Sequence, residues 1–244
     1  MYKDIAKPRP VQGRELSIIE YIGLPGAGKT TAAKAFISQS GYAVDPLSIR
    51  IINLESERRI SRVAFKLKHI LIRPVNSVNV ARAILHCRRD VADGNALRFI
   101  GAACNMMFIV ALLRSATISR TLVLDQGFYQ GCWALLRSLR KHRRTALPVP
   151  RLFELAFPDR LSLKVKVMHI ACAEQELLRR RHARSLTKLT LHWNDNADLS
   201  DEIDCIKVVF GFAVDHAVFM EELFVFSPDR AGINLCDYKK GSRN

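Results

Sequence analysis

Residues 23–31 read GLPGAGKTT, and this stretch decides the fold. It matches G-x-x-x-x-G-K-[ST] at every fixed position. The apolar run LSIIEYI at 16–22 precedes it, as expected of a buried parallel strand, and a helix should follow from Lys29 to about Gln39. A glycine-rich turn between strand and helix presents backbone N–H groups and the positive end of the helix dipole to an anion. The stretch is therefore predicted to be a phosphate-binding loop, or P-loop.

This motif predicts the residues of a nucleotide site. Lys29 should reach the β- and γ-phosphate oxygens of ATP, and Thr30 should offer its hydroxyl to Mg²⁺. The loop backbone should surround the phosphates. The expected nucleotide-binding residues are Gly23, Leu24, Pro25, Gly26, Ala27, Gly28, Lys29, Thr30 and Thr31.

A second candidate site residue is Asp125. The strand-like run TLVL at 121–124 leads directly into Asp125-Gln126-Gly127. A carboxylate at the carboxyl end of a parallel strand lies at the sheet edge where α/β folds bind their ligands. There Asp125 could bind Mg²⁺ or accept the proton of an attacking hydroxyl. The alternative is an aspartate that caps the next helix.

A cluster of arginines follows another strand-like run, at 163–171. A helix is expected around 174–184, with Arg180 and Arg184 on one face and Arg181 close to them. On a lid of about residues 174–200, Arg180 and Arg184 could stabilise the transferring phosphoryl group while Arg181 binds nucleotide. The alternative is a solvated basic helix.

The other segments complete the predicted fold. A short strand at 42–44 should close at Asp45-Pro46; Asp45 and Glu55 are candidate substrate-facing acids, although Asp45-Pro46 also suits a turn. Residues 56–117 are predicted to form a helical excursion on the substrate side. It includes an amphipathic helix with Ile60, Val63, Ala64, Leu67, Ile70 and Leu71 on one stripe and basic residues on other faces. A long helix is expected at 202–224 and an edge strand at 233–236.

Strands separated by helices indicate an α/β P-loop NTPase fold, a parallel sheet with helices on both faces. No linker rich in Gly, Pro or Ser divides residues 1–244, so we expect a single domain. The apolar segment 99–113 would rise only about 22 Å as a helix, too short for a bilayer. It is therefore predicted to be a buried helix and not a membrane span.

The amino-acid composition indicates which class of partner the protein binds. Lys and Arg number 38 against 23 acidic residues, a net charge of +15. Such a balance favours a polyanionic partner: a nucleotide, a nucleic acid, a phosphorylated metabolite or an anionic membrane surface. A basic proteome would give the same balance. The six cysteines form no CxxC pair, the histidines have no metal-ligand spacing, and residues 1–16 are polar. We expect a cytoplasmic protein with free thiols.

In its order of parts the chain resembles the nucleoside and nucleotide kinases among the P-loop proteins, in particular the thymidylate-kinase-like branch. The matching pieces are GLPGAGKTT at 23–31, TLVLDQG at 121–127 and the strand-then-arginine-helix at 163–184. The resemblance implies that Asp125 is the acid ending the third strand and that Arg180, Arg181 and Arg184 are lid residues. Gln126 stands where that group usually has Arg, and no acid-proline motif of thymidylate kinases follows the second strand.

The leading functional hypothesis is an ATP-dependent kinase that uses Mg²⁺ and transfers the γ-phosphate to a small metabolite, nucleoside or nucleotide-like acceptor. The alternative is a nucleic-acid-associated ATPase or a nucleotide-switched binding protein, supported by the net charge and by the basic runs at 137–144 and 179–188. The chain has no recognisable helicase motif and no N-K-x-D guanine signature, so nucleic acid is not the favoured partner.

Overall fold

The computed structural model describes residues 16–39, 41, 43–54, 59–72, 74–114, 120–157, 163–170, 172, 174–187, 199–215 and 220–226. Four strands form one parallel sheet: β1 (Leu16–Ile22), β2 (Thr121–Leu124), β3 (Leu163–Ile170) and β4 (Met220–Phe226). Their order is β2-β1-β3-β4, with a parallel bridge from Val44 to Thr121 beyond β2. The strand that carries the P-loop is therefore interior to the sheet.

Alternation along β1 gives each face of the sheet its own core. Ile18 and Ile22 join the larger cluster with Leu122 and Leu124, whereas Ile19 and Tyr21 join the smaller one. Successive side chains of a strand point to opposite faces, so an apolar run of this kind is buried on both sides.

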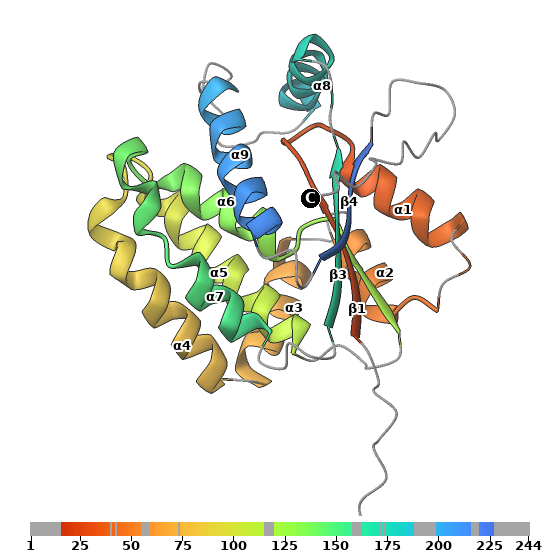
Figure 1. Ribbon diagram of the computed structural model, residues 1–244, viewed down its shortest axis with the longest axis horizontal. Coiled ribbons are helices and arrows are strands. Elements are labelled where there is room, and N and C mark those ends of the chain that lie inside the picture. Colours follow the sequence, from red (N-terminus) through yellow and green to blue (C-terminus); the bar gives the residue numbers. More distant parts are fainter. Residues whose placement is uncertain are drawn as a thin grey trace, which may run out of the picture.

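Helices cover both faces of the sheet (Figure 1). The smaller cluster includes residues of α1 (Lys29–Gln39) and α8 (Glu174–Thr187). The larger one is drawn mainly from α4 (Pro74–Leu85), α5 (Ala96–Leu113), α6 (Phe128–Ser138) and α7 (Val149–Ala156). Part of α9 (Leu199–Asp215) joins this cluster. The α/β P-loop fold predicted from the sequence is confirmed.

The apolar segment at 99–113 is a core helix. It forms most of α5, in which Phe99, Ala102, Met106 and residues 108–113 are buried. Within the described part of the chain, α5 is the one helix long and apolar enough to cross a membrane by length and composition. Since it packs against α3 (Arg59–Ile72), α4, α6 and α7, the predicted buried helix is confirmed.

Several segments differ from the predictions. A helix that was not predicted, α2 (Pro46–Asn53), begins at the Asp45-Pro46 pair. The Asp45 side chain caps it by accepting a hydrogen bond from the Leu47 amide, and Pro46 suits the first helical position. The helix expected at 202–224 ends at Asp215, and β4 follows it. Between α4 and α5, residues 86–90 form a 3₁₀ turn, η2 (His86–Asp90). The strand expected at 233–236 lies outside the described residues.

Candidate functional site

The P-loop has a backbone that glycine alone adopts readily. Gly26 and Gly28 have φ angles of +95° and +101°, in the left-handed region. A Cβ at Gly26 would lie 3.3 Å from Leu177 Cδ1 of α8, so a side chain here would also press against Leu177. The Ala27 amide donates to the Leu24 carbonyl at 3.1 Å, which closes the turn before α1 begins. The loop thus has the open, glycine-lined curve that an anion requires.

Lys29 lies at the first position of α1 and folds back along this loop. Its Nζ donates to the carbonyls of Gly23 at 2.8 Å and Leu24 at 3.1 Å. The ammonium group also influences His169 of β3: burial, and secondarily the charge of Lys29, lowers the pKa of His169 to about 4. His169 is therefore neutral at pH 7 and adds no positive charge beside Lys29.

Thr30 and Asp125 meet although 95 residues separate them. The Thr30 hydroxyl donates to Asp125 Oδ2 at 2.7 Å, and Asp125 is buried at the end of β2. Parallel pairing of β1 with β2 brings the P-loop and the end of β2 to the same sheet edge. A hydroxyl and a carboxylate oxygen this close form the hard-oxygen donor set that Mg²⁺ prefers, so the residues present fit this ion.

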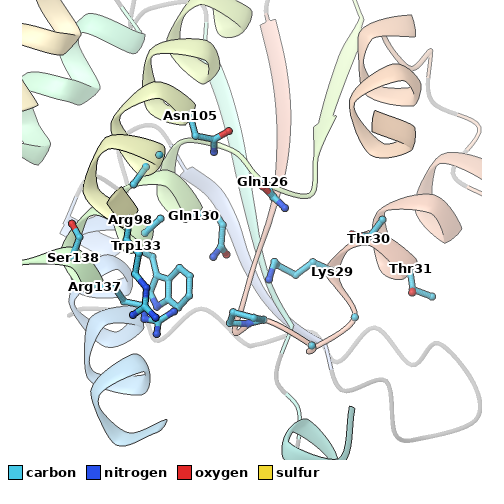
Figure 2. A pocket seen from close by; sticks show the side chains of 16 residues that line it. Lys29, Thr30, Thr31, Arg98, Asn105, Gln126, Gln130, Trp133, Arg137 and Ser138 are labelled. Atoms are coloured by element: carbon cyan, nitrogen blue, oxygen red, sulfur yellow. The ribbon is translucent and has the colours of Figure 1, made fainter. Parts of the chain in front are cut away.

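A cleft of about 560 Å³ opens beside the loop. Figure 2 shows Lys29 and Thr30 on one side and Arg98, Trp133 and Arg137 on the other. The second side, which we call the α5–α6 wall, is made by Arg98, Gly101, Ala102 and Asn105 of α5 and by Gln130, Trp133, Ala134, Arg137 and Ser138 of α6. Gln126 also lines the cleft. The lining residues include three cations and no carboxylate.

Glu20, which sequence reasoning missed, connects the two sides. This β1 side chain is buried beneath the first turn of α6, where its Oε1 accepts from the Gln130 amide at 2.8 Å. The Gln130 side chain in turn accepts from the Gly23 amide at 3.2 Å. At Gly127 a Cβ would lie 2.5 Å from the Glu20 carboxyl group, so glycine is needed there. A single acid within an apolar strand was the signal that could have revealed Glu20.

The environment of Glu20 changes its titration. Burial raises the pKa of Glu20 to about 8, although hydrogen bonds from the first amides of α6 act in the opposite direction. Glu20 is therefore mostly protonated at pH 7. It contributes hydrogen bonding and little charge beneath the cleft.

The arginines of α8 lie beside the P-loop. Arg180 donates to Glu176 at 2.6 Å and to the Ala27 carbonyl at 3.4 Å. Arg181 donates to the Pro25 carbonyl at 3.1 Å and pairs with Glu202. Leu177 of the same helix is buried against the loop at Gly26. The side chain of Arg184 lies outside the described residues.

Glu202 of α9 joins the α8 helix to the α5–α6 wall. Its buried carboxylate pairs with Arg181 and, at 2.6 Å, with Arg137, which also stacks on the Trp133 ring. The Trp133 indole N–H donates to the Glu202 carbonyl at 3.2 Å. Two arginines around one carboxylate leave a net positive charge at this end of the cleft.

Asp45, a candidate acid after the second strand, is not brought to the cleft. Asp45 is buried and caps α2, as the turn alternative anticipated in part. Glu55 lies outside the described residues. Among the described residues, no group of three or more His, Cys, Asp or Glu side chains could hold a metal ion.

Comparison with known proteins gives a likeness in fold. No protein-family model and no curated protein matches the chain. Among solved structures, a deoxyadenosine kinase from M. mycoides, with dCMP and dCDP bound as products, is similar over 85% of this chain and 88% of its own. The two chains are 12% identical, with a TM-score of 0.41. This likeness concerns the fold alone.

Proposed function

We propose that the protein is an ATP-dependent phosphotransferase that phosphorylates a small anionic acceptor of the nucleotide type. The observation that carries this proposal is the 2.7 Å hydrogen bond between Thr30 and Asp125, at the base of a P-loop that opens onto a cationic cleft. A hydrolase or a switch protein needs a nucleotide site but no cationic, polar wall of side chains opposite the P-loop. The cleft gives a kinase the room for an acceptor.

On the donor side, the chain would position the triphosphate. The loop amides would bind the phosphates, Lys29 would exchange its two carbonyl partners for β- and γ-phosphate oxygens, and Thr30 with Asp125 would hold Mg²⁺. When bound, this ion would neutralise phosphate charge. Asp125 acts in this proposal as a metal anchor, because its Oδ2 is already directed at the hydroxyl that serves the same ion.

On the acceptor side, the charges favour an anion. Arg98 and Arg137 line the α5–α6 wall, and the lining residues include no carboxylate that could serve as a general base. A hydroxyl acceptor would need such a base, whereas a phosphate oxygen is ionised at pH 7 and attacks without losing a proton. Asn105, Gln126 and Gln130 supply amide donors and acceptors for a polar ring, and Trp133 supplies a flat apolar surface.

In this proposal, the α8 helix would form part of a lid of about residues 174–200. Arg180 and Arg181 lie against the carbonyl side of the P-loop and would turn their guanidinium groups to the phosphates when nucleotide binds. Arg184 would have the same role. We further propose that residues 1–244 act as one domain, since the P-loop, α1, α5 and α6 line one cleft together.

One assay tests the proposal. The protein is incubated with γ-labelled ATP, Mg²⁺ and separate pools of nucleosides, nucleoside monophosphates, sugars and sugar phosphates, and labelled products are identified by mass. We expect label in one anionic pool. Label confined to a neutral pool would refute the anionic acceptor alone, and labelled phosphate with no labelled acceptor would indicate an ATPase and refute the kinase.

A further inference from the structure

The amphipathic helix α3 presents its apolar stripe to solvent. Ile60 is 83% exposed and Leu71 is 71% exposed, while Val63 and Leu67 are each half exposed. Phe65, on another side of the helix, packs against the larger core cluster, and Ile70 does so from the edge of the stripe. A surface helix of a globular domain normally has the reverse arrangement, with the apolar stripe toward the core. Apart from Ile70, the stripe on α3 is thus left uncovered by the rest of the described chain.

The neighbouring helix α4 also exposes apolar side chains. Val75, Val78 and Leu85 are more than half exposed. Val78 and Leu85 line a surface depression of about 580 Å³ together with Arg82, Arg88 and Arg89. Aliphatic side chains and guanidinium groups therefore share one surface. We name the α3–α4 face as Ile60, Val63, Leu67, Leu71, Ile72, Val75, Val78 and Leu85 with Lys68, Arg82, Arg88 and Arg89.

The segment that contains α3 and α4 is positively charged. Residues 59–89 contain eight cations and no Asp or Glu: Arg59, Arg62, Lys66, Lys68, Arg73, Arg82, Arg88 and Arg89. Lys68, Arg82, Arg88 and Arg89 are exposed, and among the residues that the structure describes no carboxylate pairs with any of them. The surface thus combines exposed aliphatic area with uncompensated positive charge.

We propose that the α3–α4 face binds the surface of an anionic phospholipid bilayer. The aliphatic side chains would enter the boundary between headgroups and acyl chains, and the cations would contact lipid phosphates. A helix of large amphipathicity with Lys and Arg around the apolar stripe is the form that such interfacial binding takes. No residue of α3 or α4 lines the cleft, so a protein bound in this way keeps its cleft accessible.

Charge and chemistry disfavour two other occupants. A second copy of the chain, related by a twofold axis, would bring the same cations together and repel. Single-stranded nucleic acid would satisfy the cations, but its binding surfaces use aromatic side chains for base stacking, and the exposed apolar residues here are Ile, Val and Leu.

The test is sedimentation of the full-length protein with two kinds of vesicle, phosphatidylcholine alone and phosphatidylcholine mixed with phosphatidylglycerol. We expect binding to the mixed vesicles alone. Val63→Asp should weaken that binding at least about tenfold, because it places a charge at the headgroup boundary. The matched control is Val208→Asp on α9, since Val63 is 50% exposed and Val208 is 51% exposed. Circular dichroism of both variants establishes that they are folded.

The charge is tested separately. Arg89→Glu should weaken binding at least about fivefold, as expected from roughly 1 kcal/mol per basic residue near an anionic surface. Lys34→Glu on α1 makes the same charge change at an exposed position off this face and should bind nearly as wild type. Equal binding to both kinds of vesicle would overturn the proposal, and so would equal losses of binding in the target and control variants. The proposal would also be overturned if duplex DNA displaced the protein from vesicles while the Val63→Asp variant bound DNA normally. ATP-dependent transfer is not part of the readout, so the outcome is independent of the proposed kinase activity.

Discussion

The P-loop and the α5–α6 wall form two sides of one cleft but are built differently. The loop is a run of consecutive residues whose backbone groups and glycine conformations make the site. The α5–α6 wall is made by side chains that lie apart along the chain, from Arg98 to Ser138. A site made of backbone needs glycines at fixed spacing and so leaves a motif in the sequence. A site made of side chains depends on two helices packing together, and it leaves none.

The largest effect should follow from the loss of Lys29. We expect Lys29→Ala to lower phosphoryl transfer by at least about a thousandfold, because the ammonium group is the loop's contact to the transferring charge. Lys34→Ala, on an exposed position of the same helix, should change the rate little. Turnover at saturating Mg·ATP measures both. A Lys29→Ala variant with the wild-type rate would remove the kinase hypothesis.

Asp125→Asn tests the metal anchor. We expect turnover to fall about a hundredfold, since the amide keeps an acceptor for Thr30 but loses the negative charge that holds Mg²⁺. Raising the Mg²⁺ concentration should recover part of this loss, which a lost general base would not allow. Asp93→Asn, at an exposed turn, is the control. Full turnover in Asp125→Asn would leave Asp125 as a structural residue.

These two predictions concern the side of the cleft that the sequence predicted well. The bounds of β1, α1 and β2 are those expected, because each has a pattern that the local chain specifies. Asp125 could be linked to Thr30 through the rule that parallel strands end at one sheet edge. Residues 220–224, which belong to β4, were expected to be helical, since a short apolar run does not distinguish a strand from a helix.

The residues of the α5–α6 wall could not be predicted from local sequence patterns. Arg98 and Arg137 belong to helices whose packing, and not whose sequence, directs them to one cleft. Glu20 could be noticed as an acid in an apolar strand, but only the position of α6 reveals its partner, the Gln130 amide. The outward stripe of α3 reverses the usual rule for amphipathic helices, so periodicity alone gives the helix and not the direction it faces.

Arg98→Ala tests the α5–α6 wall. We expect the KM for the acceptor to rise about tenfold or more, the size expected for losing a hydrogen bond to a charged group. The KM for ATP should change little, because Arg98 belongs to the wall opposite the loop (Figure 2). Arg82→Ala, which lies outside the cleft, serves as the control. Equal changes in both KM values would mean that the two sides of the cleft do not separate donor from acceptor.

The α8 helix allows a smaller test on the donor side. Arg180 reaches the Ala27 carbonyl, whereas Arg179 is bonded to Glu176 and is 72% exposed along its side chain. We expect Arg180→Lys to lower turnover severalfold, because lysine keeps the charge but loses the planar fork that binds phosphate. Arg179→Lys should be silent. If both variants keep the wild-type rate, α8 is the solvated basic helix of the alternative interpretation.

Glu20→Gln should have the smallest effect on activity, and it tests the connection between the two sides. Because burial raises the pKa of Glu20 to about 8, the folded protein keeps a proton that the unfolded chain releases near its ordinary value of 4.5. Between these values the unfolded state binds fewer protons, so wild-type stability falls as pH rises, by up to about 1.4 kcal/mol per pH unit from this group. Glutamine resembles the protonated acid and should still accept from the Gln130 amide.

The free energy of unfolding should therefore fall less steeply in Glu20→Gln than in wild type between pH 5 and 8, a range about as wide as the shift in this pKa. Urea titrations at several pH values measure the difference. Glu154→Gln, the same change at an exposed residue of α7, should follow the wild-type slope. If Glu20→Gln also follows it, Glu20 is ionised beneath α6. The donor loop and the α5–α6 wall would then be joined by a charged group and not by a neutral hydrogen-bonded one.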